Sequence, residues 1–154
     1  ADVHLVQHRA AVLLADDGIL ERMLVERPIE VSPALDRDRL LALRQTADEI
    51  YLDAKLRRYI LDLVSASRDP KAAGLPELAE LIGFGASPRA TLYLARAAKA
   101  FAFLRGRAFV VPEDVKELAP DVLRHRLVPT YEAEAENVSG DELVRRLLDG
   151  VEVP

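Results

Sequence analysis

The chain has 154 residues, of which 50% are hydrophobic, and it carries a formal net charge of −5 at pH 7. It contains no cysteine, which excludes disulfides, thiolate metal sites and cysteine nucleophiles. The acidic balance argues against a general nucleic-acid binder, and no apolar run reaches the roughly 20 residues of a membrane-spanning helix. Aromatic residues make up only 5% of the chain, so we expect an aliphatic core and an all-α fold.

The first 27 residues are expected to form a helical segment. The run Asp16-Asp17-Gly18 is a turn signal that separates two apolar stretches. The origin of this segment stays open between a remnant of a preceding domain, an artificial addition and a helical hairpin that could drive dimerisation. His4 and His8 stand one helical turn apart, but no third ligand accompanies them, so no metal site is predicted.

Residues 28–35 contain Pro28 and Pro33 and are expected to form an extended linker, because a residue before proline avoids the helical region. The remaining domain is then 36–154. No signal peptide is recognised at the beginning of the chain. Together with the lack of cysteine, this favours a cytoplasmic location.

Two helices are expected to follow the linker. The first has an apolar face at the three-and-four spacing of a buried helix side, made of Leu40, Leu41, Leu43, Ala47 and Ile50. Asp53 is the candidate N-cap of the second helix, which ends at Asp69-Pro70. A short helix is expected at 75–78. The inner stripe of the second helix consists of Leu56, Tyr59, Ile60, Leu63 and Val64.

The segment Gly85-Ala86-Ser87-Pro88-Arg89-Ala90 indicates the start of the next helix. Ser87 is expected to cap its first free N–H groups, and Pro88 to take its first position. Arg89 then projects from the first turn, where the helix end attracts anions and a guanidinium can bind phosphate oxygens. The sequence therefore predicts a phosphate site at these three residues. The alternative is a surface arginine that pairs with an acid of the next helix.

The helix from Pro88 to about Arg105 is expected to turn Leu92, Ala95, Ala98 and Ala102 toward the core. Tyr93 is interpreted as a packing residue. The cations that follow form either a solvated edge or a contact with another domain or subunit. They are Arg96, Lys99, Arg105 and Arg107.

Residues 109–111 and 126–128 are expected to pair as a small two-stranded β element. Between them, Pro112 opens a helix that Pro120 should kink or split. Ser139, with Glu142 three residues later, is a capping-box signal for a last helix that ends near Gly150.

Motifs of an independent enzyme are missing. The chain has no G-x-x-x-x-G-K-[ST] loop to cradle phosphates and no G-x-S-x-G nucleophile elbow. Glu132, Glu134 and Glu136 alternate in a polar stretch, which is typical of a solvated edge rather than of acid–base catalysis.

A combined pattern lies in five segments, which are Gly85-Ala86-Ser87-Pro88-Arg89-Ala90, Ala97-Ala98-Lys99-Ala100, Leu104-Arg105-Gly106-Arg107, Val111-Pro112-Glu113-Asp114-Val115 and Ala119-Pro120-Asp121-Val122-Leu123-Arg124-His125-Arg126-Leu127. With this pattern the chain resembles, over roughly residues 30–154, the C-terminal lid of MoxR-family AAA+ ATPases.

The resemblance implies a helical bundle of the AAA+ lid type, which follows an α/β ATPase core. In this family ATP with Mg lies between core and lid, and rings, usually hexamers, remodel protein partners, often with von Willebrand A-domain proteins. Arg89 matches the sensor 2 arginine, which reaches the γ-phosphate, and Ser87 and Pro88 match the helix start that aims it.

The phosphate loop, the acidic magnesium motif and sensor 1 of the core find no match, so the chain is expected to be a lid without its core and to hydrolyse no ATP alone. One arginine–phosphate contact contributes about 1.5–3 kcal/mol, whereas micromolar affinity needs about 8 kcal/mol. Two alternatives are a protein-interaction bundle without a nucleotide role and, less favoured by the charge, a helical nucleic-acid binder.

Overall fold

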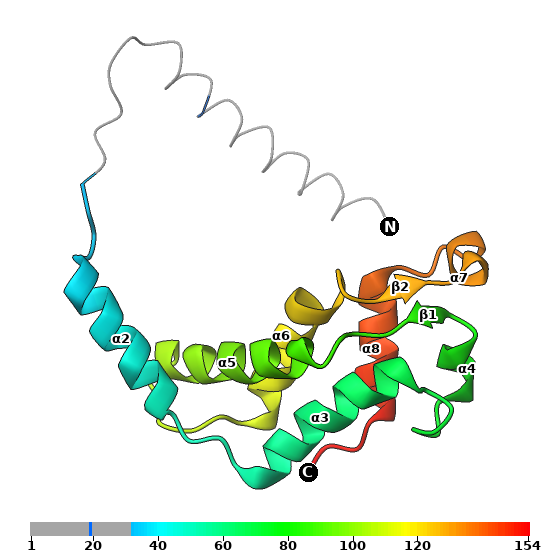
Figure 1. Cartoon of the computed structure of the whole chain (residues 1–154), viewed down its shortest axis with the longest axis horizontal. Coiled ribbons are helices and arrows are strands. Elements are labelled where there is room, and N and C mark those ends of the chain that lie inside the picture. Colours follow the sequence, from blue (N-terminus) through cyan, green and yellow to red (C-terminus); the bar gives the residue numbers. More distant parts are fainter. Residues whose placement is uncertain (1–18, 20–31) are drawn as a thin grey trace, which may run out of the picture. The chain divides into compact units, whose positions relative to one another are not determined.

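The computed structural model describes Ile19 and residues 32–154. The expectations for residues 1–27, including His4 and His8, lie outside the described residues. The chain divides into two compact units, 1–35 and 36–154, and the second contains the helices and strands that follow (Figure 1). Residues 32–35, the described part of the expected linker, contain neither helix nor strand.

Helices dominate the second unit. The five longer ones are α2 (Arg37–Glu49), α3 (Ala54–Arg68), α5 (Arg89–Leu104), α6 (Pro112–Leu123) and α8 (Gly140–Gly150). Two short helices, α4 (Pro76–Ala79) and α7 (Tyr131–Ala135), lie beside a two-stranded ribbon of β1 (Ile82–Phe84) and β2 (Val128–Pro129). No helix in the described part of the chain is long and apolar enough to cross a membrane.

The N-caps follow the sequence signals. The Asp53 carboxylate accepts a hydrogen bond from Lys55 N at 2.8 Å at the start of α3, and the Ser139 hydroxyl accepts one from Glu142 N at 3.2 Å at the start of α8. α3 ends before Asp69, and α8 ends at Gly150. The caps by Asp53 and Ser139 and the two helix ends are confirmed. The second half of the predicted capping box does not form among the described residues, because the Glu142 carboxylate accepts hydrogen bonds from Arg145 and Arg146 instead.

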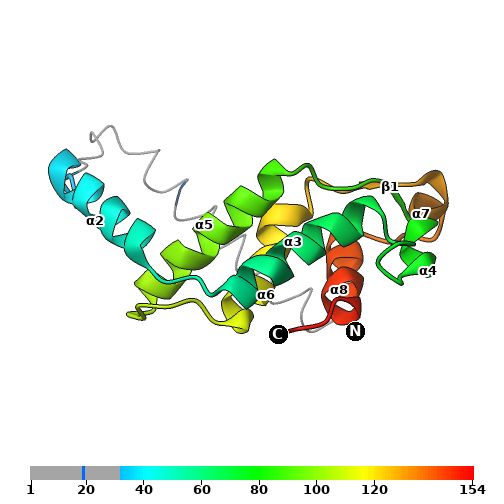
Figure 2. The same cartoon turned by 60° about the horizontal axis from the view of Figure 1, so that its bottom comes forward.

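The core lies where α3, α5, α6 and α8 meet. α5 packs against α3 and α6, and α8 packs against α3 and α6 (Figures 1 and 2). The predicted inner stripe of α3 is buried throughout. The largest fully buried side chains are Tyr59, Ile60, Leu63, Leu78, Leu94, Leu123, Leu143, Leu147, Val115 and Val144.

The prediction for the inner face of α5 is wrong at Leu92, which is 61% exposed. The buried row is Ala90, Leu94, Ala98 and Ala102, at a strict spacing of four. Leu94 replaces Leu92 because two residues along a helix correspond to about 200° of rotation, so only one of the two can face the core.

The predicted buried face of α2 is also wrong. α2 contains no buried residue, and Leu40 and Leu41 are 50% and 42% exposed. Among the predicted residues only Ile50, which caps the end of the helix, is buried. α2 lies at one end of the unit and packs against α5 (Figure 1), so much of its surface has no neighbour among the described residues.

The two-stranded element exists, but not between the predicted segments. β1 pairs with β2 in an antiparallel arrangement that sets Phe84 opposite Val128, whereas Phe109 forms an isolated parallel bridge with Tyr51. The reason is α6, which runs unbroken through Pro120 for 12 residues, about 18 Å. It holds the segments 109–111 and 126–128 at opposite ends, and the predicted split at Pro120 does not occur.

Candidate functional site

The start of α5 follows directly from β1 through residues 85–88. Pro88, and not Ser87, is the N-cap residue, and no side chain caps the helix. Instead, Ala90 N donates to the Ser87 carbonyl at 2.8 Å and Thr91 N donates to the Pro88 carbonyl at 3.2 Å. The predicted side-chain cap by Ser87 is therefore wrong, because tight i+3 backbone bonds already occupy these N–H groups. Pro88 lies one position earlier than predicted but has helical angles, with φ −55° and ψ −23°, and the phosphate contact expected of residues 87–89 stays a prediction.

The first half of the motif is packed against α3. Gly85 approaches so closely that a Cβ atom there would lie 2.2 Å from the Ser67 carbonyl oxygen. Ala86 is fully buried, and its N–H donates to the Ser67 hydroxyl at 3.0 Å. Gly85 is thus required for close backbone packing.

The second half of the motif is exposed, since Ser87, Pro88 and Arg89 all lie on the surface. The Arg89 guanidinium makes no ion pair and no side-chain hydrogen bond within the described part of the chain. The expected alternative, in which Arg89 pairs with an acid of the next helix, is not observed. α5 itself contains no acidic residue, so an anion approaching Arg89 meets no carboxylate on this helix.

The other cations along α5 behave differently from one another. Lys99 Nζ donates to the Asp48 carbonyl and links α5 to α2. Arg105 pairs with Glu117 at 3.1 Å and lies over the Phe101 ring. Arg96 is exposed and makes no ion pair with the described residues. In both respects it resembles Arg89.

Arg107 and Asp114 form the most buried ion pair that the structure describes. The Asp114 side chain is 3% exposed and that of Arg107 is 28% exposed. Burial of Asp114 raises its pKa, but the hydrogen bonds from Arg107 and from Val111 N outweigh this effect and leave the pKa below its usual value. This pair fixes the turn between α5 and α6 and is structural.

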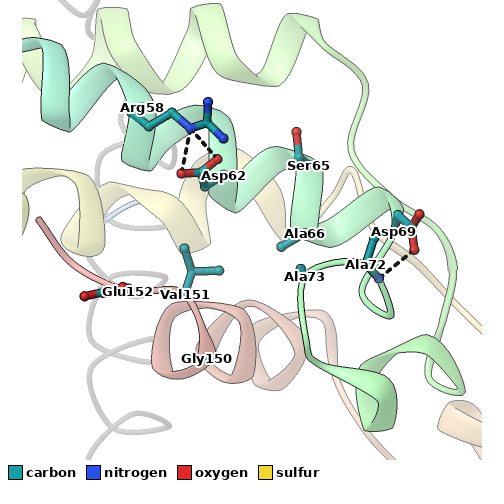
Figure 3. A pocket seen from close by; sticks show the side chains of 10 residues that line it. All are labelled: Arg58, Asp62, Ser65, Ala66, Asp69, Ala72, Ala73, Gly150, Val151 and Glu152. Atoms are coloured by element: carbon teal, nitrogen blue, oxygen red, sulfur yellow. Dashed lines mark hydrogen bonds and ion pairs between the residues drawn. The ribbon is translucent and has the colours of Figure 1, made fainter.

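A groove lies between α3, the turn at 69–73 and the segment after α8 (Figure 3). Its volume is about 560 Å³. The charged side chains in it are mostly engaged, because Arg58 Nε donates to both Asp62 oxygens and Asp69 accepts a hydrogen bond from Ala72 N (Figure 3). None of residues 87–89 lines this groove.

No group of three or more potential metal ligands occurs within the described ranges. Sequence reasoning missed Ser67, the residue that holds the start of the motif. A lone serine in the last turn of a helix carries no local signal for a contact 19 residues away.

Residues 78–147 match the AAA lid domain family. Over 88% of its length the chain is 40% identical to the chaperone MoxR1 of Mycobacterium tuberculosis. The chain contains the lid domain of a MoxR-family AAA+ ATPase. This confirms the family that the five sequence segments indicated.

Two further relatives agree with this assignment. Protein MoxR of Paracoccus denitrificans is 46% identical over 53% of the chain and 26% of that protein. The crystal structure of a candidate ATPase from Cytophaga hutchinsonii superposes with a TM-score of 0.81 at 35% identity, over 90% of this chain and 42% of that one. The chain spans 36% of MoxR1, so it corresponds to little more than a third of that relative.

Proposed function

We propose that this MoxR-family lid senses ATP through Arg89, which acts as the sensor 2 arginine and contacts the γ-phosphate. The observation that supports this most is the exposed Arg89 guanidinium, which makes no ion pair with the described residues and lies at a helix start whose backbone is held on α3. An arginine that served only folding would be expected to use its charge within the domain, as Arg107 does with Asp114.

The residues present fit a phosphate better than a metal ion. A guanidinium offers a fixed fork of donors to phosphate oxygens, and no acid of α5 competes for it. Mg²⁺ prefers carboxylate oxygens and water, so the residues that hold it would belong to an ATPase core. ATP would supply the phosphoryl group for hydrolysis, while Arg89 would bind its terminal phosphate and orient it.

The lid would then couple nucleotide state to movement. Loss of the γ-phosphate removes the anion that Arg89 contacts, and the helical bundle that contains α5 would then move as one body.

MoxR1 is called a chaperone, and we extend this to the present family member. The ATPase would be a cytoplasmic, chaperone-like remodelling ring, a hexamer, with lid contacts between subunits and von Willebrand A-domain proteins as partners. The isolated lid would hydrolyse no ATP.

The test is ATP turnover by the ATPase that contains this lid, with Arg89→Ala compared with Arg96→Ala. Both residues are exposed arginines of α5 without ion pairs among the described residues. Arg89→Ala should lower kcat by about tenfold or more, the equivalent of one charged hydrogen bond, and Arg96→Ala should keep it within about twofold. Equal turnover in the two variants contradicts the proposal.

A second candidate function is a protein-interaction bundle without a nucleotide role. It is favoured by α2, which exposes Leu40 and Leu41 and buries no residue. Exposed apolar side chains that lie together commonly mark interaction surfaces. Under this alternative Leu41→Glu would abolish partner binding, and Arg89→Ala would leave ATP turnover unchanged.

A further inference from the structure

The hydroxyl of Ser67 joins two segments that are distant in the sequence. Ser67 lies in the last turn of α3 and is 1% exposed. Its hydroxyl donates to the Val64 carbonyl at 2.7 Å and accepts a hydrogen bond from Ala86 N at 3.0 Å. Because its proton is used within α3, a lone pair is left for the Ala86 N–H. The end of α3 is thereby tied to the segment that leads into α5.

Gly85 makes the second contact of this connection. A Cβ atom on Gly85 would lie 2.2 Å from the Ser67 carbonyl oxygen and 2.6 Å from Arg68 Cα. The φ of Gly85 is not in the left-handed region, so close packing and not backbone conformation demands glycine. The two backbones can therefore pack this closely only with glycine at position 85.

These contacts determine the position of Arg89 at the start of α5. Ala86 and Ala90 are both fully buried, and only the three exposed residues Ser87, Pro88 and Arg89 lie between them. We propose that the Ser67–Gly85 clamp, meaning the Ser67 hydroxyl, the Ala86 N–H and the Gly85 backbone contact, positions Arg89 for the terminal phosphate. Ser67 is thus a positioning residue, an inference that rests on the proposed function of Arg89.

Ser67→Ala is expected to lower the rate because it displaces Arg89. Ser67→Ala leaves the buried Ala86 N–H without a partner, which favours a shift of the segment toward water. A misplacement of about 1 Å at a positioning group can cost up to about 100-fold in rate. Arg89 stays charged and exposed in this variant, so only its location would change.

The experiment measures kcat for ATP in the ATPase that contains this lid. Ser67→Ala should lower kcat at least about threefold. Ser67→Thr, which keeps the hydroxyl, should have a kcat within about twofold of that of the unmodified ATPase. Ser65→Ala is the matched control, since Ser65 is an exposed serine of the same helix. In an Arg89→Ala background, Ser67→Ala should cause no further loss, because the clamp acts through Arg89.

The outcomes separate the two proposals. Unchanged kcat in Arg89→Ala overturns the proposed function, and the clamp with it. Reduced kcat in Arg89→Ala together with unchanged kcat in Ser67→Ala overturns the clamp alone, and so does a further loss in the double variant, which would show a general structural role.

A measurement on the unmodified chain covers the case in which Ser67→Ala does not fold. Amide hydrogen exchange should be much slower at Ala86, which is buried and hydrogen-bonded, than at the exposed Ser87. Equal, fast exchange at both positions would overturn the clamp.

Discussion

Arg107 and Asp114 are joined by paired hydrogen bonds that close the turn between α5 and α6. Arg107 Nη1 donates to Asp114 Oδ2 at 2.8 Å, Arg107 Nη2 donates to Oδ1, and Val111 N donates to Oδ2 at 2.9 Å. Asp114 is 2% exposed. One carboxylate therefore caps the start of α6 and holds the preceding turn against it.

We predict that Asp114→Ala lowers the free energy of unfolding by about 2–3 kcal/mol, because it removes a helix cap and leaves Arg107 unpaired. Glu113→Ala, an exposed acid of the same helical turn, should change it by less than about 0.5 kcal/mol. Urea unfolding of the chain measures both. If Asp114→Ala lowered the free energy of unfolding by no more than Glu113→Ala does, the ion pair would contribute no stability.

Glu142 should make stability depend on pH in the acid range. Hydrogen bonds from Arg145 and then from Arg146 lower its pKa from 4.5 to about 2. A carboxylate with a lowered folded-state pKa stabilises the protein above its unfolded pKa, and this contribution is lost as pH falls from about 4.5 to about 2.

The measurement is the urea midpoint of the chain and of Glu142→Gln between pH 7 and pH 2. The difference between the two should be largest near neutral pH and should shrink across that window. A difference that stays constant with pH would mean that Glu142 has no lowered pKa in the folded state.

The register of α5 can be tested with two leucines. Leu94 is fully buried and Leu92 is exposed. Leu94→Ala should lower the free energy of unfolding by about 2–5 kcal/mol through the cavity that it leaves, whereas Leu92→Ala should change it by less than about 0.5 kcal/mol. Chemical denaturation that reports the larger cost for Leu92→Ala would reverse the assigned inner face.

Substitution of Tyr59 is expected not to lower the stability, in contrast to Asp114→Ala and Leu94→Ala. It is 2% exposed, and its hydroxyl has no hydrogen-bond partner in the described structure. An unpaired buried hydroxyl carries a desolvation cost, so Tyr59→Phe should leave the stability unchanged or raise it by up to about 1 kcal/mol. Thermal unfolding measures this change, and a clear loss of stability would reveal a hydrogen bond to the hydroxyl.

Most features that depend on sequence neighbours were predictable, although the cap by Ser87 and the split at Pro120 were predicted wrongly. The caps at Asp53 and Ser139 and the ends of α3 and α8 follow from side chains within three residues of the backbone groups that they contact. The inner stripe of α3 was also correct, because that helix is packed along its length.

Features that depend on the third dimension were not predictable in the same way. The pairing of Phe84 with Val128 requires knowledge of how α6 separates the flanking segments. The exposure of Leu40 reflects the position of α2 at the end of the unit, which no periodicity encodes.

At the candidate site, one local prediction was correct, another was wrong, and a long-range contact was missed. The sequence indicated Arg89 as a projecting cation because Ser-Pro marks a helix start, and Arg89 is indeed exposed at the beginning of α5. It did not indicate Ser67, since a hydrogen bond across 19 residues leaves no local pattern. It also assigned the cap to the Ser87 hydroxyl, although the backbone alone forms the first turn.

The central claim is that Arg89 contacts the γ-phosphate, and the most direct measurement compares the affinities for ATP and ADP in the ATPase that contains this lid. Arg89→Ala should weaken binding of a non-hydrolysable ATP analogue by about tenfold or more and leave ADP binding within about twofold, because only the former carries the contacted phosphate. Equal losses for both nucleotides, or no loss for either, would contradict it.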